Sequence, residues 1–324
     1  MAAMPAMQRS AARVCSPAEH ARMLPLAPPT TRSVCIVARS AAGVASTNGA
    51  AAAPAPIIVN VPEPKPAVLP PAASYANMAT LGGAKAAMPA RKTFVLGIMA
   101  GAYVAFGSFL MLAVGGAMPG LMATNPGLWK LTYGLVFPFG LGMVLLGGGE
   151  LYTGNTLFIT SALIEKKCTL ADLAKNWSCS YAGNMVGSLA MVAAVLGSGV
   201  MAGNMMPVNV ATAKATLPFA VAITRAILAN WLVCIAVKQA AAASTLPGKM
   251  LAIWPPITAF VVLGLEHSVA NMFTVPLGIA LGAKVTMADF VINNLIPVTI
   301  GNTIAGVVCM AFVYAVTFGA WQQK

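Results

Sequence analysis

Two related stretches decide the fold: Gly264-Leu265-Glu266-His267-Ser268-Val269-Ala270-Asn271, and, 116 residues earlier, Gly148-Gly149-Glu150-Leu151-Tyr152-Thr153-Gly154-Asn155. Each stretch places a glycine, a glutamate and an asparagine at the same spacing between long apolar runs. A carboxylate within such a run is costly unless the chain stops being helical there and frees backbone N–H groups for it. Both stretches therefore predict a membrane helix that is interrupted.

Two further pairs of motifs recur at nearly the same offset. Thr169-Leu170-Ala171-Asp172-Leu173 matches Thr286-Met287-Ala288-Asp289-Phe290 at 117, and Gly183-Asn184 matches Gly301-Asn302 at 118. Three matches at almost one offset indicate an internal repeat. Because each copy holds three crossings, the second copy must enter the membrane upside down relative to the first.

The composition supports a membrane protein. Of 324 residues, 59% are hydrophobic and 8% are charged, with a mean hydropathy of +0.81, which soluble domains do not approach. No run of Lys and Arg interleaved with aromatic residues is present, so a nucleic-acid partner is not expected. Because a span needs about 20 apolar residues, we expect an all-α protein of six spanning helices, at 93–118, 130–148, 176–201, 216–238, 250–264 and 290–318. The apolar pieces 156–164 and 272–283 are expected to be the second halves of interrupted helices 2 and 5.

The first 90 residues have a different character. Residues 1–40 contain five Arg, no Lys and one acid among Ala, Ser, Thr and Pro, which is typical of a transit peptide. Residues 41–90 are rich in Ala and Pro and are expected to be a disordered linker. The first repeat is then expected at 91–205 and the second at 206–324. We expect a chloroplast destination, although composition alone does not separate chloroplast from mitochondrion.

Basic residues predict the orientation in the membrane. Lys85, Arg91, Lys92, Lys166, Lys167, Lys175, Lys238, Lys249 and Lys324 fall on one side, against Lys130, Lys214 and Lys284 on the other. By the positive-inside rule, both termini are expected in the cytoplasm-like compartment, which in a plastid is the stroma.

The apolar segments contain a few ionisable groups that need an explanation. Glu150 and Glu266, at equivalent positions in the two breaks, can accept hydrogen bonds from the freed N–H groups, or pair with Arg225 or Lys214. Lys214 lies near a helix end, where it either snorkels to the interface or attracts anions. The sequence leaves both alternatives open.

His267 differs from the other polar groups because the first repeat has no counterpart for it. Leu151 occupies the equivalent position, and His267 is the one histidine outside the predicted transit peptide. A lone histidine between apolar segments is usually a core residue with satisfied hydrogen bonds. Its place at a helix break beside a glutamate equally favours a role in a transport pathway.

Five ordered motifs resemble the formate/nitrite transporter family. They cover about 90–320 and comprise Gly149-Glu150-Leu151-Tyr152-Thr153-Gly154-Asn155, Asn176-Trp177 with Tyr181-Ala182-Gly183-Asn184-Met185-Val186-Gly187, Ile227-Leu228-Ala229-Asn230-Trp231-Leu232-Val233-Cys234, Gly264-Leu265-Glu266-His267-Ser268-Val269-Ala270-Asn271-Met272-Phe273, and Asn294-Leu295-Ile296-Pro297-Val298-Thr299-Ile300-Gly301-Asn302. With its presequence, the chain is most similar to a plastid-envelope branch of green algae that includes nitrite and bicarbonate carriers.

The resemblance implies an aquaporin-like protomer and a homopentamer with one pore per protomer. His267 matches the central pore histidine, Lys214 the vestibule lysine that draws anions in, and Thr153 the threonine that faces the histidine. The implied constriction residues are Phe137, Leu141, Leu151, Tyr152 and Phe260, with Tyr152 standing where a Phe is common. Asn155, Asn271 and Thr153 are expected to bind the substrate or orient the imidazole, and Glu150 and Glu266 to lie in the pore region.

These features predict transport of a small monovalent weak-acid anion, with protonation aided by His267 and with protons and membrane lipid as the other partners. Nitrite import into the chloroplast is the first expectation, with bicarbonate and formate as alternatives. An aquaporin-like channel for neutral solutes would carry two Asn-Pro-Ala boxes, whereas the sequence has one Asn125-Pro126-Gly127. An enzyme is not expected, because His267 with Glu266 and Ser268 are sequence neighbours rather than an assembled triad. No cofactor or metal is expected, because the cysteines lack metal-ligand spacing.

Overall fold

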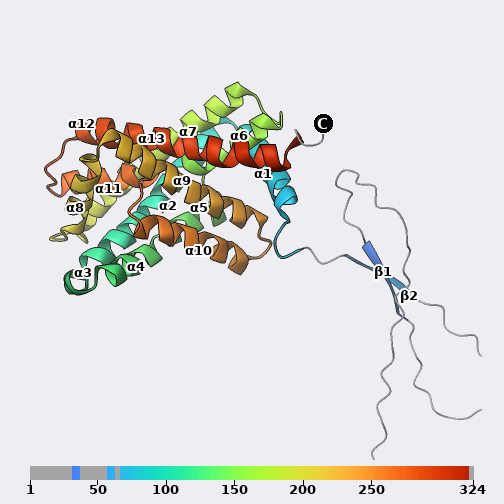
Figure 1. Cartoon of the computed structure of the whole chain (residues 1–324), viewed down its shortest axis with the longest axis horizontal. Coiled ribbons are helices and arrows are strands. Elements are labelled where there is room, and N and C mark those ends of the chain that lie inside the picture. Colours follow the sequence, from blue (N-terminus) through green and yellow to red (C-terminus); the bar gives the residue numbers. More distant parts are fainter. Residues whose placement is uncertain (1–30, 37–56, 63–65, 321–324) are drawn as a thin grey trace, which may run out of the picture. The chain divides into compact units, whose positions relative to one another are not determined.

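The computed structural model describes residues 31–36, 57–62 and 66–320, which fall into two units divided after Lys65. In the first unit, β1 (Thr31–Ile36) pairs antiparallel with β2 (Ile57–Pro62), from Thr31 opposite Pro62 to Ile36 opposite Ile57. Residues 1–30 and 37–40 of the predicted transit peptide lie outside the described residues. The second unit is a bundle of helices (Figure 1).

Six spans make up this bundle, as predicted, and the second and fifth are interrupted. Three helices connect or precede the spans: α1 (Pro71–Ala86), α3 (Pro119–Thr124) and α8 (Met206–Ala215). The spans are, in order, α2 (Ala90–Gly116); α4 (Pro126–Val136), α5 (Pro138–Leu146) and α6 (Tyr152–Ile164); α7 (Leu170–Ser198); α9 (Phe219–Ala242); α10 (Leu246–Val262) and α11 (Ser268–Ala280); and α12 (Met287–Asp289), the π-helix η1 (Phe290–Leu295), α13 (Ile296–Ile304), the π-helix η2 (Ala305–Phe312) and α14 (Val313–Phe318).

The two breaks lie where the related stretches predicted them. Helix α5 ends at Leu146 and α6 begins at Tyr152, while α10 ends at Val262 and α11 begins at Ser268. Gly148 and Gly264 adopt left-handed backbone angles, with φ of 74° and 67°, in these two gaps. Glycine pays no Cβ penalty in that region, which explains why the same residue type recurs in both copies.

Equivalent residues of the two repeats also form the same local structures. Thr169 and Thr286 each begin a helix with a capping box, in which the threonine and an aspartate three residues later bond each other's backbone N–H. The repeat is therefore a property of the structure and not a chance recurrence of small residues.

Helix α1 corrects the prediction of a disordered linker over 41–90, as does β2 within the same segment. Pro71 occupies the first helical turn, where its missing N–H costs nothing. Gly82 lets α1 pack so closely on α6 that a Cβ there would overlap the carbonyl of Phe158. Because α1 is short and carries small side chains, composition alone did not reveal that it packs.

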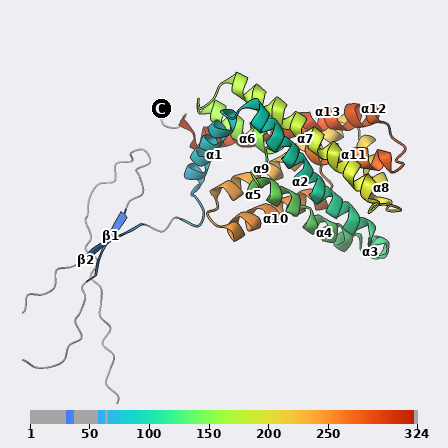
Figure 2. The same ribbon diagram turned by 180° about the vertical axis from the view of Figure 1, so that it is seen from behind.

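The start and the end of the second unit meet at one residue. Tyr75 Oη on α1 donates to Glu165 Oε1 at 2.9 Å, and the backbone N–H of Ala320 donates to the same oxygen at 3.3 Å. Figures 1 and 2 accordingly show α1 beside the C-terminal end of the chain in both views. Burial, reinforced by the hydrogen bond from Tyr75 to Glu165, raises the pKa of the Tyr75 phenol. Both ends of this unit therefore lie at the same end of the bundle.

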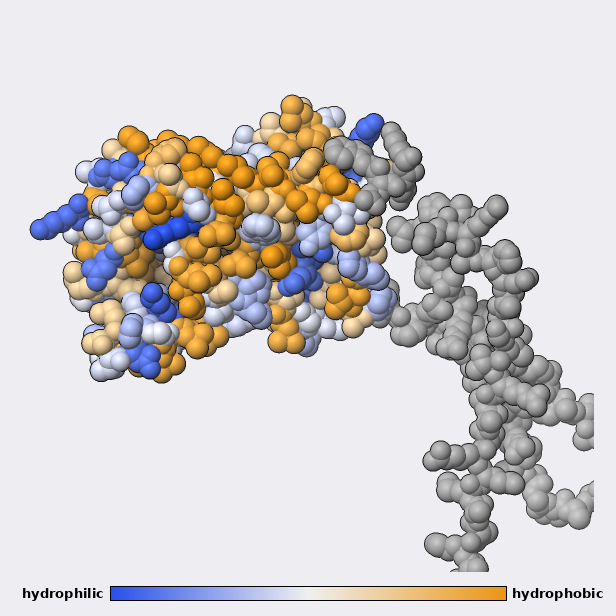
Figure 3. All heavy atoms as spheres, in the orientation of Figure 1, coloured by the Kyte–Doolittle hydropathy of each residue, from blue (hydrophilic) through white to orange (hydrophobic). Residues whose placement is uncertain are grey.

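Small residues bring α2 and α7 together. Gly97 and Gly101 on α2 face Gly183 and Gly187 on α7, and a Cβ on any of them would meet backbone atoms of the opposite helix. Without a hydrophobic force between helices in lipid, such close backbone packing is a main source of association. Large apolar side chains instead face outward, and they dominate the surface seen in Figure 3.

Replacing Gly183 with alanine is expected to lower the stability of the bundle by about 2 kcal/mol, because overpacking forces α2 and α7 apart. Gly197→Ala on the same helix is the matched control, because nothing lies within 4 Å of a Cβ there. Thermal unfolding of the detergent-purified variants measures the difference. An unfolding midpoint of Gly183→Ala equal to or above that of Gly197→Ala would show that α2 and α7 do not depend on this close contact.

Candidate functional site

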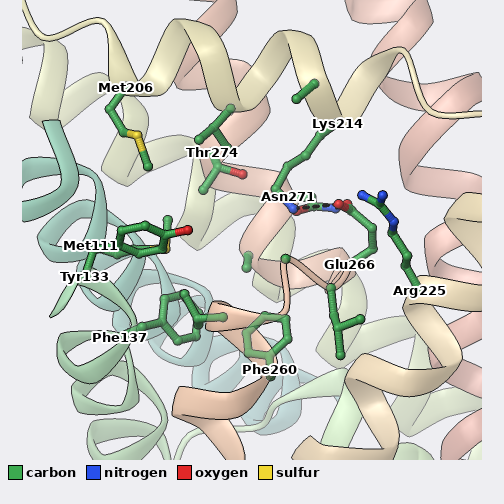
Figure 4. A pocket seen from close by; sticks show the side chains of 16 residues that line it. Met111, Tyr133, Phe137, Met206, Lys214, Arg225, Phe260, Glu266, Asn271 and Thr274 are labelled. Carbon is green, nitrogen blue, oxygen red and sulfur yellow. Dashed lines mark hydrogen bonds and ion pairs between the residues drawn. The ribbon is translucent and has the colours of Figure 1, made fainter. Parts of the chain in front are cut away.

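The break that carries Glu266 is built around a buried carboxylate. Its Oε1 accepts from Lys214 Nζ at 2.9 Å, and its Oε2 accepts from Asn271 Nδ2 at 2.7 Å and Asn294 Nδ2 at 3.1 Å. Glu266 is 2% exposed, so these three donors replace the water that the carboxylate lacks. Lys214, Glu266 and Asn271 line a cavity of about 220 Å³ with Arg225, Phe137 and Phe260, termed here the Lys214 vestibule (Figure 4).

The first repeat builds the same cluster at the other break. Glu150 Oε1 accepts from Lys85 Nζ at 2.5 Å, and Oε2 accepts from Asn155 Nδ2 at 2.8 Å and Asn176 Nδ2 at 3.4 Å. A second cavity of about 400 Å³, the Lys85 vestibule, is lined by Lys85, Glu150, Leu96, Lys92 and Lys249 among others. Residues 66–320 therefore hold two related charged chambers, one at each break.

One asparagine in each repeat fixes the backbone of a break. Asn302 Nδ2 donates to the carbonyls of Ala226 at 2.8 Å and Glu266 at 3.0 Å, and Asn302 Oδ1 accepts from the N–H of Ser268 at 2.8 Å. Because Glu266 and Ser268 lie at the break, their backbone groups have no helical partner, and a buried side-chain amide satisfies them instead. Asn184 does the same in the first repeat, with Gly97 O, Glu150 O and Tyr152 N.

A small apolar cavity lies at the centre of the site, and its volume of about 10 Å³ is close to the space of one water. Three pairs of its wall residues are repeat equivalents, namely Val104 with Val233, Leu141 with Ile257, and Leu151 with His267, and Phe137 and Phe260 complete the wall. Phe137 and Phe260 also line the Lys214 vestibule, with ring centroids 5.5 Å apart. The imidazole is the one polar side chain in this wall.

The imidazole of His267 is held at both nitrogens. Its Nδ1 accepts from the N–H of Ala270 at 3.2 Å, and its Nε2 lies 2.8 Å from Thr153 Oγ1. Because Nδ1 accepts, the neutral ring carries its proton on Nε2 and donates it to the threonine. Asn230 Nδ2 in turn donates to the carbonyl of Thr153 at 3.2 Å. The starts of α6 and α11 therefore meet through one polar pair.

The comparisons with known proteins agree with this geometry. The family model described as formate/nitrite transporter matches residues 72–316. The chain belongs to the formate/nitrite transporter family. A probable formate transporter of Methanothermobacter thermautotrophicus is 41% identical over 249 residues, covering 71% of this chain and 90% of the relative.

Two solved structures extend the likeness to three dimensions. An "FNT family ion channel" superposes with a TM-score of 0.69 at 31% identity, covering 76% of this chain and 98% of that one. A "pentameric formate channel with formate bound" gives a TM-score of 0.63 at 29% identity, covering 71% and 97%. The predicted fold, six spans in two inverted repeats with an aquaporin-like arrangement, is confirmed, and membership in a transporter family accords with the expectation that the chain is not an enzyme.

The structure places half of the twelve predicted site residues around the central cavity. Phe137, Leu141, Leu151, Phe260 and His267 line it, and Thr153 bonds the imidazole. Tyr152 does not join them. Its hydroxyl lies 2.8 Å from Thr303 Oγ1, and its ring meets Trp177 and Tyr181 edge-on, so the assignment of Tyr152 to a constriction is corrected.

One of the two roles predicted for Asn155 and Asn271, orienting the imidazole, needs a similar correction. Their Nδ2 atoms donate to Glu150 and Glu266 and to the neighbouring asparagines, and no hydrogen bond to His267 is found for either within residues 66–320. They orient the carboxylates, and their other predicted role, binding the substrate, stays a prediction; Asn271 lines the Lys214 vestibule.

Sequence reasoning missed Lys85, which was counted as a loop lysine. Lys85 and Lys214 lie 129 residues apart, and the same offset relates Pro89 to Pro218, which precede α2 and α9 with nearly identical backbone angles. A search for repeats at a second offset would have paired the two lysines.

Proposed function

We propose that this member of the formate/nitrite transporter family moves a small monovalent weak-acid anion, nitrite foremost, across the inner membrane of the chloroplast envelope. The observation that carries the proposal is the central cavity, in which His267 is the one polar side chain among the described lining residues. The cavity shares Phe137 and Phe260 with the Lys214 vestibule, and its wall residue Leu151 follows Glu150 of the Lys85 vestibule in the chain. A basic vestibule at each end suits an anion, and an apolar centre suits a neutral molecule.

The size and polarity of the central cavity account for the chemistry. A cavity of about 10 Å³ has no room for a hydration shell, and an unpaired charge in such a place is expensive. An anion that gains a proton becomes a neutral acid, and its desolvation cost falls steeply. His267 is the one titratable group in the wall, so the imidazole, with Thr153 bonded to it, is positioned to aid this protonation.

Nitrite is preferred over formate and bicarbonate because of the predicted transit peptide, since nitrite is reduced in the stroma. Both termini are then on the stromal side. The pentameric assembly of a solved relative, together with the exposed apolar face of this protomer, supports a homopentamer with one pore per protomer. The relatives named as formate transporters make formate the main alternative substrate.

Uptake by the purified protein in liposomes tests the proposal. Nitrite uptake is expected to rise as the external pH falls from 8 to 6, because acidification increases the protonated fraction, and to exceed bicarbonate and formate uptake at each pH. Liposomes without protein provide the background of passive nitrous acid diffusion. Faster formate or bicarbonate uptake would overturn the substrate, and protein-dependent uptake that is independent of pH would overturn the mechanism.

A further inference from the structure

The charged groups of the Lys214 vestibule do not all serve as free charges. Three such groups line the cavity: Lys214, Glu266 and Arg225. The first two form an ion pair at 2.9 Å, and the side chain of Lys214 is 18% exposed. Because the pair is neutral as a unit, the remaining net charge of the vestibule comes from Arg225.

Glu266 forms its ion pair with Lys214, and among residues 66–320 no salt bridge joins it to Arg225. Its Oε1 accepts from Lys214, and its Oε2 accepts from Asn271 and Asn294. Arg225 is exposed and lines the cavity, with its guanidinium on the side of the Glu266 carboxylate (Figure 4), and in the described part of the chain no salt bridge or hydrogen bond involves that guanidinium. Its five N–H donors are therefore available to a solute.

The fold fixes the position of Arg225 on α9. The neighbouring Ala222 and Ala226 are fully buried against Val298 on α13. Asn302 bonds the carbonyl of Ala226 with the same amide that bonds the carbonyl of Glu266, so one side chain ties this turn of α9 to the break. The guanidinium is consequently presented at the vestibule by a rigid backbone.

We propose that Arg225 is the residue that concentrates and selects anions in the Lys214 vestibule, whereas Lys214 chiefly compensates Glu266. The inference rests on the proposed function. A guanidinium is a planar fork that binds two oxygens of a planar oxyanion at once, and it is more weakly hydrated than an ammonium. Formate, nitrite and bicarbonate all present two oxygens in that geometry, so the class of substrate fits the donor.

The opposite chamber follows the same rule with different residues. The repeat equivalent of Arg225 is Leu96, which lines the Lys85 vestibule. There Lys85 is paired with Glu150, and the additional basic residues in the wall are Lys92 and Lys249. Each vestibule thus combines a neutral Lys–Glu pair with basic residues outside the pair, and only the Lys214 side has a guanidinium.

Arg225→Gln is expected to raise the KM for nitrite about five-fold at low ionic strength, with the maximal rate within about two-fold of the unchanged protein, since a charge at a cavity mouth raises local anion concentration. Arg225→Lys should give an intermediate KM, because it keeps the charge and loses the fork. Lys130→Gln is the matched control, because it removes an exposed charge on α4 that lines neither vestibule, and it should leave the KM unchanged.

The measurement is the initial rate of nitrite uptake into proteoliposomes, with nitrite added on the side that the Lys214 vestibule faces, at 10 and 200 mM salt. Gel filtration of each purified variant confirms that it assembles like the unchanged protein. An Arg225→Gln KM equal to that of the unchanged protein at 10 mM salt overturns the inference while the proposed function stands. The inference is also overturned if Arg225→Gln lowers the maximal rate by a larger factor than it raises the KM. Absence of uptake by the unchanged protein overturns both proposals.

Discussion

Replacing His267 with phenylalanine is expected to abolish pH-dependent uptake of the anion in proteoliposomes. Phenylalanine removes the one titratable group in the wall of the central cavity and leaves that wall wholly apolar. An anion entering the cavity then has no protein partner with which to exchange a proton, and crossing as a charged species is expensive. The rate of uptake at acidic pH should fall at least about 100-fold, which corresponds to an increase of about 3 kcal/mol in the free-energy barrier to crossing.

The matched control for this variant is Leu151→Phe. Leu151 is the repeat equivalent of His267 and lines the same cavity, so its substitution adds bulk there while the imidazole stays in place. Leu151→Phe is expected to slow uptake and to keep its pH dependence. If His267→Phe transports with the pH profile of the unchanged protein, the imidazole has no part in protonation.

Asn302→Leu is expected to give the largest loss of stability. Asn302 is fully buried, and its amide satisfies the carbonyls of Ala226 and Glu266 and the N–H of Ser268. The carbonyl of Glu266 and the N–H of Ser268 would lose this partner, whereas the carbonyl of Ala226 lies within α9 and keeps its helical bond. An orphaned buried polar group costs about 1–3 kcal/mol, so two of them should cost about 4 kcal/mol together. The thermal midpoint of the purified protein should fall by about 10 °C on the scale of domains of this size.

Asn293→Leu is the appropriate comparison, because Asn293 lies in the same span and makes one long hydrogen bond, to Asp289 at 3.4 Å. Its midpoint should stay near that of the unchanged protein. Equal midpoints for the two leucine variants would mean that the break at Glu266 is held by something other than Asn302.

The breaks could be predicted from sequence because their signals are local. Gly264, Glu266 and Asn271 stand within eight residues, and their counterparts stand at one offset, so a single comparison revealed both. The ion pair of Lys214 with Glu266 was among the expected alternatives, since the sequence offered two cations for the two carboxylates.

The pairing of Lys85 with Glu150 could not be found the same way. The offset between the repeats falls from 129 before the breaks to 116 at the breaks, so the first repeat holds 13 more residues in between, where α3 lies. Helix α1 lacks strong hydropathy and is stabilised by packing against α6. The amino-acid composition of α1 does not predict that contact. Only the three-dimensional fold brings residue 85 to residue 150.

The orientation of Tyr152 illustrates a third limit. Tyr152 is the first residue of α6, and the direction of its side chain depends on how the chain leaves the break. The hydrogen bond from its N–H to Asn184 sets that exit angle, which turns the phenol toward Tyr181 and Thr303. Residue identity alone did not determine which way the ring points.

The unequal chemistry of the two copies gives the conduit a front and a back. From the Arg225 side a solute meets two aromatic rings, Phe137 and Phe260, before the centre, whereas from the Lys85 side it passes aliphatic side chains such as Val144 and Leu141. Two inverted repeats with identical side chains would conduct an anion equally well in both directions. We therefore expect rectification: if the asymmetry of these linings governs passage, the flux under a reversed driving force should differ in magnitude from the forward flux, and oriented proteoliposomes measure the ratio.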